Sequence, residues 1–183
     1  MRVSGKLLII LIFGTALVGG VATLWVQFDA RRRSREFWGA DNAVLINRAP
    51  KVELLRLTKA SEPRDDGSQV TIDNVTFEIS ERKDVSKTRG FVHVRDALIR
   101  DAGFEWDKAR GDCVPQWDFA LDFEKGDQKA IVAIDLNCER VQLVAGGQEA
   151  SIGPTMSGIK NWLDAEFPEM MKNKKREEEL PDS

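Results

Sequence analysis

An uninterrupted run of twenty uncharged residues, Leu7–Val26, constrains this chain more than any other feature of its sequence. A helix rises about 1.5 Å per residue, so the run would span about 30 Å, the thickness of the hydrocarbon core of a bilayer. Backbone N–H and C=O groups need partners there, and a helix of this length supplies them. The sequence therefore predicts an N-terminal tail at residues 1–6 and a single transmembrane helix at residues 7–28, with Trp25 and Phe28 as interfacial aromatic residues.

A cleavable signal peptide is the alternative interpretation of this run. Arg2 and Lys6 provide a basic start, and Gly20–Ala22 offers small residues of the kind found at cleavage sites. The apolar run nevertheless continues through Val26, beyond the length of a typical signal core. We therefore favour a retained anchor over a cleaved leader.

Four arginines follow the predicted helix, Arg31, Arg32, Arg33 and Arg35, whereas two Lys/Arg precede it. Counted literally, the positive-inside rule places the C-terminal domain in the cytoplasm. In the commoner arrangement of N-terminal anchors, however, a short N-terminus stays inside and the remainder of the chain is exported. This arrangement would place the domain outside the cytoplasm. We favour, weakly, a single-pass protein of the cell membrane with an extracytoplasmic domain. In either orientation the arginines are predicted to contact membrane lipid from a basic juxtamembrane segment at residues 29–48.

The remainder of the chain is acidic. Residues 37–183 carry 21 Lys/Arg against 28 Asp/Glu, a net charge of −7. A domain with this balance lacks the basic surface that binds nucleic acid, so nucleic acid is not a predicted partner.

A globular α+β domain is predicted at residues 49–168, followed by a disordered, charged tail at 169–183. Strands are predicted at 51–57 and around 70–79, and helices at 91–102 and 155–167, the former with Gly103 as its C-terminal cap. The economical arrangement is one antiparallel sheet with both helices packed on a single face and a polar opposite face.

Residues 116–136 form the clearest predicted hairpin. Gly126-Asp127 suits a two-residue turn with glycine first, and this turn pairs residues whose numbers sum to 253. In this register every pair on one face is apolar: Phe123 with Ala130, Leu121 with Val132, Phe119 with Ile134, and Trp117 with Leu136.

The hairpin register also brings two pairs of reactive side chains together. Asp118 falls opposite Asp135, a like-charged pair that needs solvent, a basic neighbour or a cation to be tolerated. Cys113 and Cys138 become diagonal neighbours, near the upper limit for a disulfide. A disulfide and two buried free thiols therefore both remain open, and the compartment decides between them.

Common catalytic patterns are missing from the sequence. His93 is the only histidine and shares its predicted helix with polar neighbours, and there is no GxxxxGK[ST], GxGxxG, GxSxG or CxxC pattern. No cofactor or metal is predicted. The sequence favours a non-enzymatic, membrane-tethered domain that binds a protein or envelope component. The alternative is a small membrane-bound enzyme or thiol-redox protein that uses Cys113 and Cys138.

Small residues in the predicted membrane helix suggest one further interaction. Thr15, Gly19 and Thr23 recur at four-residue spacing, which allows two transmembrane helices to approach closely. Self-association through this stripe is therefore a hypothesis.

Overall fold

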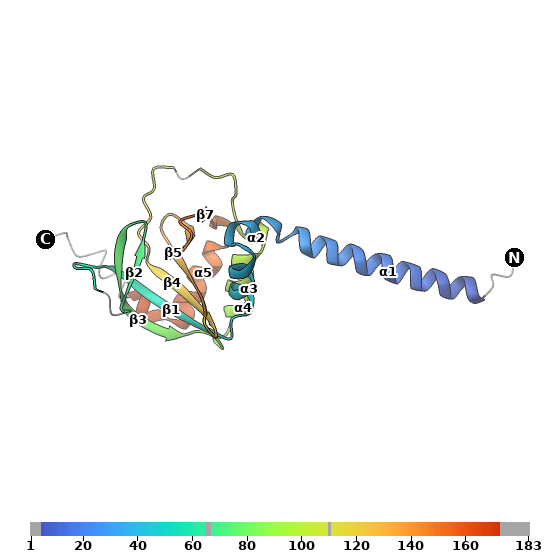
Figure 1. Cartoon of the computed structure of the whole chain (residues 1–183), viewed down its shortest axis with the longest axis horizontal. Helices are drawn as coiled ribbons and strands as arrows, with labels where there is room; N and C mark the ends of the chain where they lie inside the picture. Colours follow the sequence, from blue (N-terminus) through green and yellow to red (C-terminus); the bar gives the residue numbers. More distant parts are fainter. Residues whose placement is uncertain (1–4, 65–66, 110, 173–183) are drawn as a thin grey trace.

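A long N-terminal helix projects from a single packed domain in the computed structural model of the chain (Figure 1). The structure describes residues 5–64, 67–109 and 111–172, without the side chains of residues 5–10, 12 and 27. The projecting helix is α1 (Gly5–Asp29), and only two residues separate it from α2 (Arg32–Trp38). Within this described part, no helix is long and apolar enough to qualify as a membrane span. The predicted span at residues 7–28 therefore stays a prediction from the sequence.

The domain is α+β, as predicted, but it contains more helices than the two expected. After α2 come α3 (Ala40–Arg48), α4 (Phe91–Ile99), the 3-10 helix η1 (Asp101–Gly103) and α5 (Gly153–Glu166). The strands are β1 (Lys51–Lys59), β2 (Gln69–Ile72), β3 (Val75–Asp84), β4 (Phe119–Lys125), β5 (Gln128–Asp135), β6 (Arg140–Leu143) and β7 (Glu149–Ser151).

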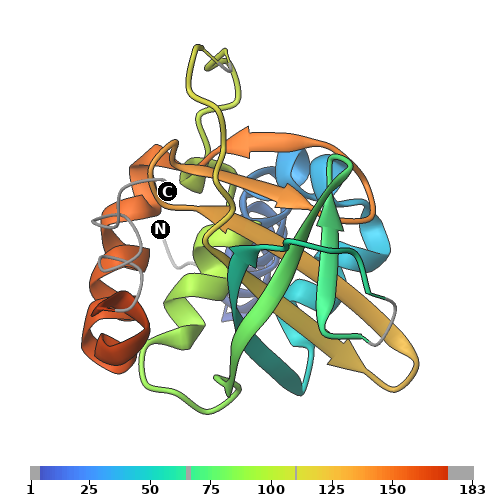
Figure 2. The ribbon, with the colours of Figure 1, turned by 90° about the vertical axis from the view of Figure 1, so that its left-hand side faces the viewer.

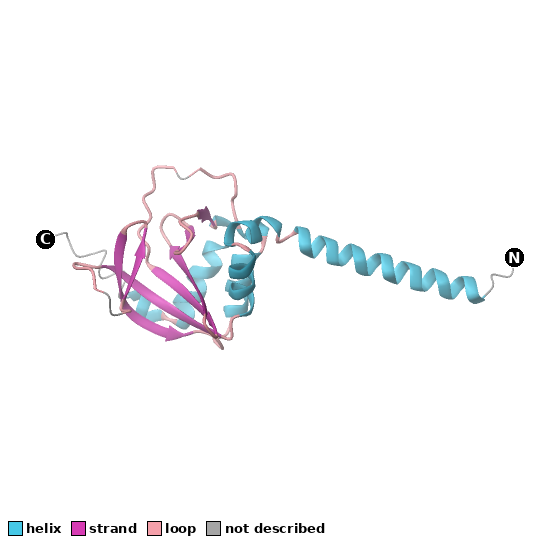
Figure 3. Ribbon diagram, viewed as in Figure 1, coloured by secondary structure: helices cyan, strands magenta, loops and turns pink. Residues whose placement is uncertain are grey.

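One antiparallel sheet contains all seven strands, in the order β2-β3-β1-β4-β5-β6-β7 (Figure 3). Strand β1 pairs with β3 on one side and with β4 on the other. The register between β1 and β3 shifts at Arg56/Leu57, an irregularity of the kind that increases strand twist. The sheet is strongly curled, and β2 and β3 turn away from β5 and β6 in Figure 2.

Curling buries both faces of the sheet, so the prediction of a polar opposite face is wrong. The larger core lies between the sheet and helices α2–α5 and includes Leu54, Phe119 and Leu121. A second apolar cluster lies on the other face and includes Leu55, Ile72 and Ala120. Alternation alone could not reveal this second core, because its fully buried members in β4 and β5 are the small Ala120 and Ala133.

The hairpin of β4 and β5 has the predicted register. Phe119 pairs with Ile134, Leu121 with Val132 and Phe123 with Ala130. Gly126 has φ 59°, which the first position of the expected turn requires. The outermost predicted pair is wrong, because Trp117 lies in the second core whereas Leu136 lies in the larger one.

The predicted helix at 91–102 is divided in the structure. Helix α4 ends at Ile99 and is followed by η1, so Gly103 does not cap one continuous helix. A Cβ added at Gly103 would lie 2.3 Å from the Ala97 carbonyl oxygen, and this close approach explains the glycine.

The packed domain also begins earlier and ends later than the predicted range 49–168. Trp38 in α2 and Ile46 in α3 are buried in the larger core, so residues 32–48 belong to the domain rather than to a separate juxtamembrane segment. Met170 and Met171 are buried too, in a helical turn at 168–172. The remainder of the predicted disordered tail, 173–183, lies outside the described residues.

Candidate functional site

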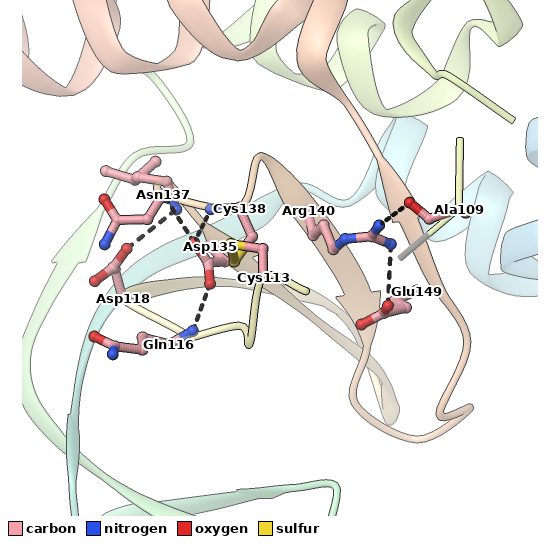
Figure 4. The surroundings of a disulfide bond; sticks show 10 residues. Ala109, Cys113, Gln116, Asp118, Asp135, Asn137, Cys138, Arg140 and Glu149 are labelled. Carbon is pink, nitrogen blue, oxygen red and sulfur yellow. Dashed lines mark hydrogen bonds and ion pairs between the residues drawn. A yellow bond between two sulfur atoms is a disulfide. The ribbon is translucent and has the colours of Figure 1, made fainter. Parts of the chain in front are cut away.

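Two regions gather charged or reactive side chains, and the first is the loop between η1 and β4. Cys113 in this loop is joined by a disulfide to Cys138, just after β5, with their Cα atoms 5.8 Å apart (Figure 4). Cys113 is exposed and Cys138 is half-buried. The described chain contains no free cysteine.

The Asp135 carboxylate fixes the backbone around this disulfide. It is fully buried, and Oδ1 accepts hydrogen bonds from the N–H groups of Asn137 (2.6 Å) and Cys138 (2.8 Å). Oδ2 accepts a third from the N–H of Gln116, in the loop (Figure 4). A buried carboxylate with three backbone donors needs no cation to balance it.

The second member of the predicted aspartate pair has its own backbone partner. Asp118 Oδ2 accepts a hydrogen bond from the N–H of Leu136 at 3.1 Å. Each carboxylate thus accepts one backbone N–H from the segment opposite to it, Asp135 from Gln116 and Asp118 from Leu136. Among the described residues, no group of three or more His, Cys, Asp or Glu side chains could hold a metal ion. The pair is therefore a structural connection, of a kind not considered among the compensations expected from the sequence.

Arg140 makes the third attachment of this loop. Its guanidinium is buried, Nη1 lies 3.0 Å from Glu149 Oε1, and Nη2 donates a hydrogen bond of 2.8 Å to the Ala109 carbonyl. We call the disulfide, Asp135 and the Arg140–Glu149 pair the loop clip. Arg140 and Glu149 carry no sequence pattern that marks them as a buried pair, and neither was predicted as a site residue.

The second region lies where α1 joins the domain, and it starts with a rigid connection. The N–H groups of Arg33 and Ser34 donate to the Asp101 carboxylate at 3.0 and 2.8 Å, which caps the start of α2. The Asp101 N–H in turn donates to the Ala30 carbonyl at 2.9 Å. The Trp38 indole N–H donates to the Leu98 carbonyl at 2.6 Å. The exit of α1 is therefore held against α4 and η1.

The four arginines predicted at the membrane surface occupy different environments here. Arg31 lies 3.8 Å from Asp96, and Arg33 lies 3.5 Å from Asp107. The Arg35 guanidinium lies over the Phe28 ring at 5.2 Å, and Arg32 is exposed. Only part of the cluster is therefore neutralised by the domain's own carboxylates.

A cavity of about 360 Å³ lies between the end of α1 and α3. Its described lining contains three arginines and no acidic residue: Leu24, Phe28, Arg31, Arg35, Ala43, Val44, Asn47, Arg48 and Ile99. We call this cavity the arginine pocket. Arg31 and Arg35 were predicted site residues, whereas Arg48 and Asn47 were not, although the i, i+4 spacing of Val44 and Arg48 places them on one face of α3.

Two further cavities continue this surface over α4. One is bordered by His93 together with Arg31, Arg95 and Arg100, and the other by Arg48, Lys87 and Arg95. Burial lowers the pKa of the Arg95 guanidinium, which donates to the Ala49 carbonyl at 2.6 Å and so holds the end of α3. His93 therefore belongs to this basic surface rather than to the loop clip.

The basic surface contrasts with the remainder of the domain. Residues 29–48 and 85–101, which supply α2, α3 and α4, carry nine Lys/Arg and five Asp/Glu. The other residues, 49–84 and 102–183, have the opposite balance, with 16 Lys/Arg and 25 Asp/Glu. Positive charge is thus concentrated beside the exit of α1.

Among the residues that the structure describes, Asp122 is the one buried carboxylate whose pKa is displaced. Its side chain is fully buried, and burial raises its pKa above the ordinary value of 3.8, although Lys129 Nζ lies 2.8 Å from Oδ2. Lys129 is about half exposed and also approaches Glu124 at 3.7 Å. These residues form a charged strip along β4 and β5, away from both regions above.

No family model, curated protein or solved structure matches this chain significantly.

Proposed function

We propose that this chain is a membrane-anchored, non-enzymatic binding domain that α1 holds at the surface of a cell membrane. The observation that carries the proposal is a helix with an uncharged run of twenty residues, Leu7–Val26, joined by only two residues to the basic side of an otherwise acidic domain.

The surface of α1 favours an apolar surrounding. Nine of its large apolar side chains are 60–71% exposed: Leu11, Phe13, Leu17, Val18, Val21, Leu24, Trp25, Val26 and Phe28. An exposed apolar surface of this extent is typical of membrane or protein contact. Thr15 and Thr23 donate their hydroxyl hydrogens to the carbonyls of Leu11 and Gly19, at 3.0 and 2.8 Å. These polar groups are thus paired inside the helix, as a bilayer interior requires.

The junction after α1 supports a fixed orientation of the domain. The hydrogen bonds to Asp101 tie α2 to η1, and the Ala30 carbonyl ties the end of α1 to the same residue. With α1 in a bilayer, the α2–α3–α4 side would face the headgroups. Its arginines would then lie at the depth where anionic lipid attracts basic side chains.

The disulfide supports an extracytoplasmic domain. Disulfides persist in oxidising compartments and are rare in a reducing cytoplasm. Several arginines after α1 are also used by the fold, as in the Arg33–Asp107 pair, so their number is a weaker indicator of orientation than the positive-inside rule assumes.

A binding role has more support than the enzyme alternative. Cys113 and Cys138 are joined to each other, and His93 borders a different, basic cavity. The groups that a thiol or acid-base enzyme would use are thus separated rather than gathered in one cleft. A protein or envelope component remains the expected partner of the exposed surfaces.

Self-association through α1 is a secondary element of this proposal. A Cβ added at Gly19 or Gly20 would meet nothing within 4 Å, so the small-residue stripe is open to a second helix.

Alkaline extraction and a topology reporter test the proposal together. We expect the full chain to stay in the membrane pellet in alkaline carbonate. We also expect a C-terminal alkaline phosphatase fusion, active only in an oxidising compartment, to be active. Recovery of a soluble mature chain that begins near Thr23 would contradict the anchor, and an inactive fusion on an intact chain would contradict the orientation.

A further inference from the structure

We infer that the arginine pocket is a binding site for the headgroup phosphate of an anionic phospholipid. This inference rests on the proposed anchoring by α1 and adds the ligand class and the residues that bind it.

Along the chain, the residues that line the pocket change from apolar to basic, as a phospholipid changes from acyl chain to phosphate. Leu24 and Phe28 lie one helical turn apart near the C-terminal end of α1, where the anchor would leave the hydrocarbon. Arg31 and Arg35 follow along the chain and border the same cavity. Apolar side chains would thus contact the upper acyl chain and glycerol, and guanidinium groups would meet the phosphate.

Two of these guanidinium groups have no carboxylate partner in the part of the chain that the structure describes. Arg35 lies only over the Phe28 ring, and Arg48 makes no ion pair with a described residue. Arginine binds phosphate oxygens through parallel N–H donors, which makes it the side chain of choice for this group. Arg31 already makes one long ion pair, 3.8 Å from Asp96. Asn47 in α3 adds a side-chain amide donor to the lining.

The position of the pocket favours a lipid over a soluble anion or a peptide. The cavity is formed partly by α1 itself, so a ligand that enters it contacts the anchor. Val44 in α3 is 47% exposed beside the arginines, and Val92 in α4, beside the neighbouring cavity, is 67% exposed. Apolar side chains placed among basic ones on a solvent-facing surface are expected where that surface meets a bilayer interface.

Native mass spectrometry of the full chain in non-ionic detergent tests the inference. The probes are dioctanoyl-phosphatidylglycerol and, as the uncharged comparison, dioctanoyl-phosphatidylcholine. Each arginine near lipid contributes about a fivefold preference for anionic lipid, so we expect the wild type to prefer phosphatidylglycerol by roughly 20-fold. The double variant R35Q/R48Q should lose this preference.

The matched control removes two positive charges elsewhere. The connection between β1 and β2 lies at the end of the domain away from α1 (Figure 1). Lys59 is the last residue of β1, and Arg64 belongs to this connection. The K59Q/R64Q variant has the same net charge as R35Q/R48Q and should keep the wild-type preference. A second test, V44W, fills the pocket and leaves every charge in place. It should also reduce the preference at least fivefold, and it decides the question if R35Q/R48Q does not fold.

An unchanged preference in R35Q/R48Q or V44W would overturn the pocket, and so would an equal loss in K59Q/R64Q. Carbonate extraction of the same proteins separates this outcome from failure of the proposed function. If the chain stays in the membrane pellet but shows no lipid preference, the lipid site is contradicted and the membrane anchor is not. If the chain leaves the pellet yet keeps the preference, the membrane anchor is contradicted and the lipid site is not.

Discussion

The loop clip and the arginine pocket both concentrate charge, but they differ in where the partners of that charge come from. In the loop clip, Asp135 accepts three backbone N–H groups and Arg140 is paired with Glu149. In the arginine pocket, Arg35 and Arg48 have no carboxylate partner among the described residues. Charge that the chain satisfies itself indicates structure, whereas charge left unsatisfied beside a cavity indicates a ligand.

The strongest way to test this contrast is to remove the acceptor at the centre of the loop clip. We expect Asp135→Ala to destabilise the domain by about 4 kcal/mol, because three backbone N–H groups would lose their acceptor in a buried site. Chemical denaturation followed by tryptophan fluorescence measures the change. Asp135→Asn keeps one carbonyl oxygen as an acceptor and should cost clearly less. A loss below about 1 kcal/mol for Asp135→Ala would mean that the loop clip is not structural.

The disulfide is the next largest contribution expected in the loop clip. The C113S/C138S variant should lose about 3 kcal/mol in the chain-entropy model, since the bridge closes a loop between positions 25 residues apart. The same denaturation curves measure it. The loss should match that of the reduced wild type, and reduction should not affect the variant. Equal stability of the oxidised wild type and the variant would show that Asp135 and Arg140 hold the loop without the bridge.

The hairpin and the loop clip also show how far the sequence could be followed. The register of β4 and β5 was predictable because apolar alternation and the Gly126 turn specify the same pairing. The register fails at Trp117, where the strand has not yet begun and the loop is held by Asp135. Backbone N–H donors have no sequence signature, so the real partners of the aspartates could not be predicted.

The boundaries of the domain were misjudged for a related reason. The four arginines favoured a basic juxtamembrane segment over residues 29–48, whereas Trp38 and Ile46 in this range are fully or almost fully buried in the core. The arginine pocket needs α3 to be packed beside α1, so Arg48 and Asn47 could be recognised only after this packing was known.

Asp122 is intermediate between the loop clip and the arginine pocket. Its carboxylate is buried, and Lys129, the cation 2.8 Å from it, is about half exposed. The folded-state pKa of Asp122 is raised, so folding disfavours the ionised form. This penalty is absent below the ordinary pKa of 3.8, where the carboxyl is protonated in both states, and grows as pH rises through the folded-state pKa. We expect Asp122→Asn to gain about 1 kcal/mol at pH 7 and nothing at pH 3. Denaturation at both pH values measures it, and a loss at pH 7 would show that the Lys129 pair outweighs burial.

The smallest effect on stability is expected in the arginine pocket, and this makes it the sharpest test of the contrast. R35Q/R48Q removes no ion pair between described residues, so the free energy of unfolding should change by less than about 0.5 kcal/mol. The same variant is expected to lose its lipid preference, so binding and stability should separate. Asp135→Ala should show the opposite combination, a large loss of stability with the lipid preference kept in the folded fraction. If R35Q/R48Q instead cost as much as Asp135→Ala, these arginines would be structural, and the distinction between satisfied and unsatisfied charge would fail for this protein.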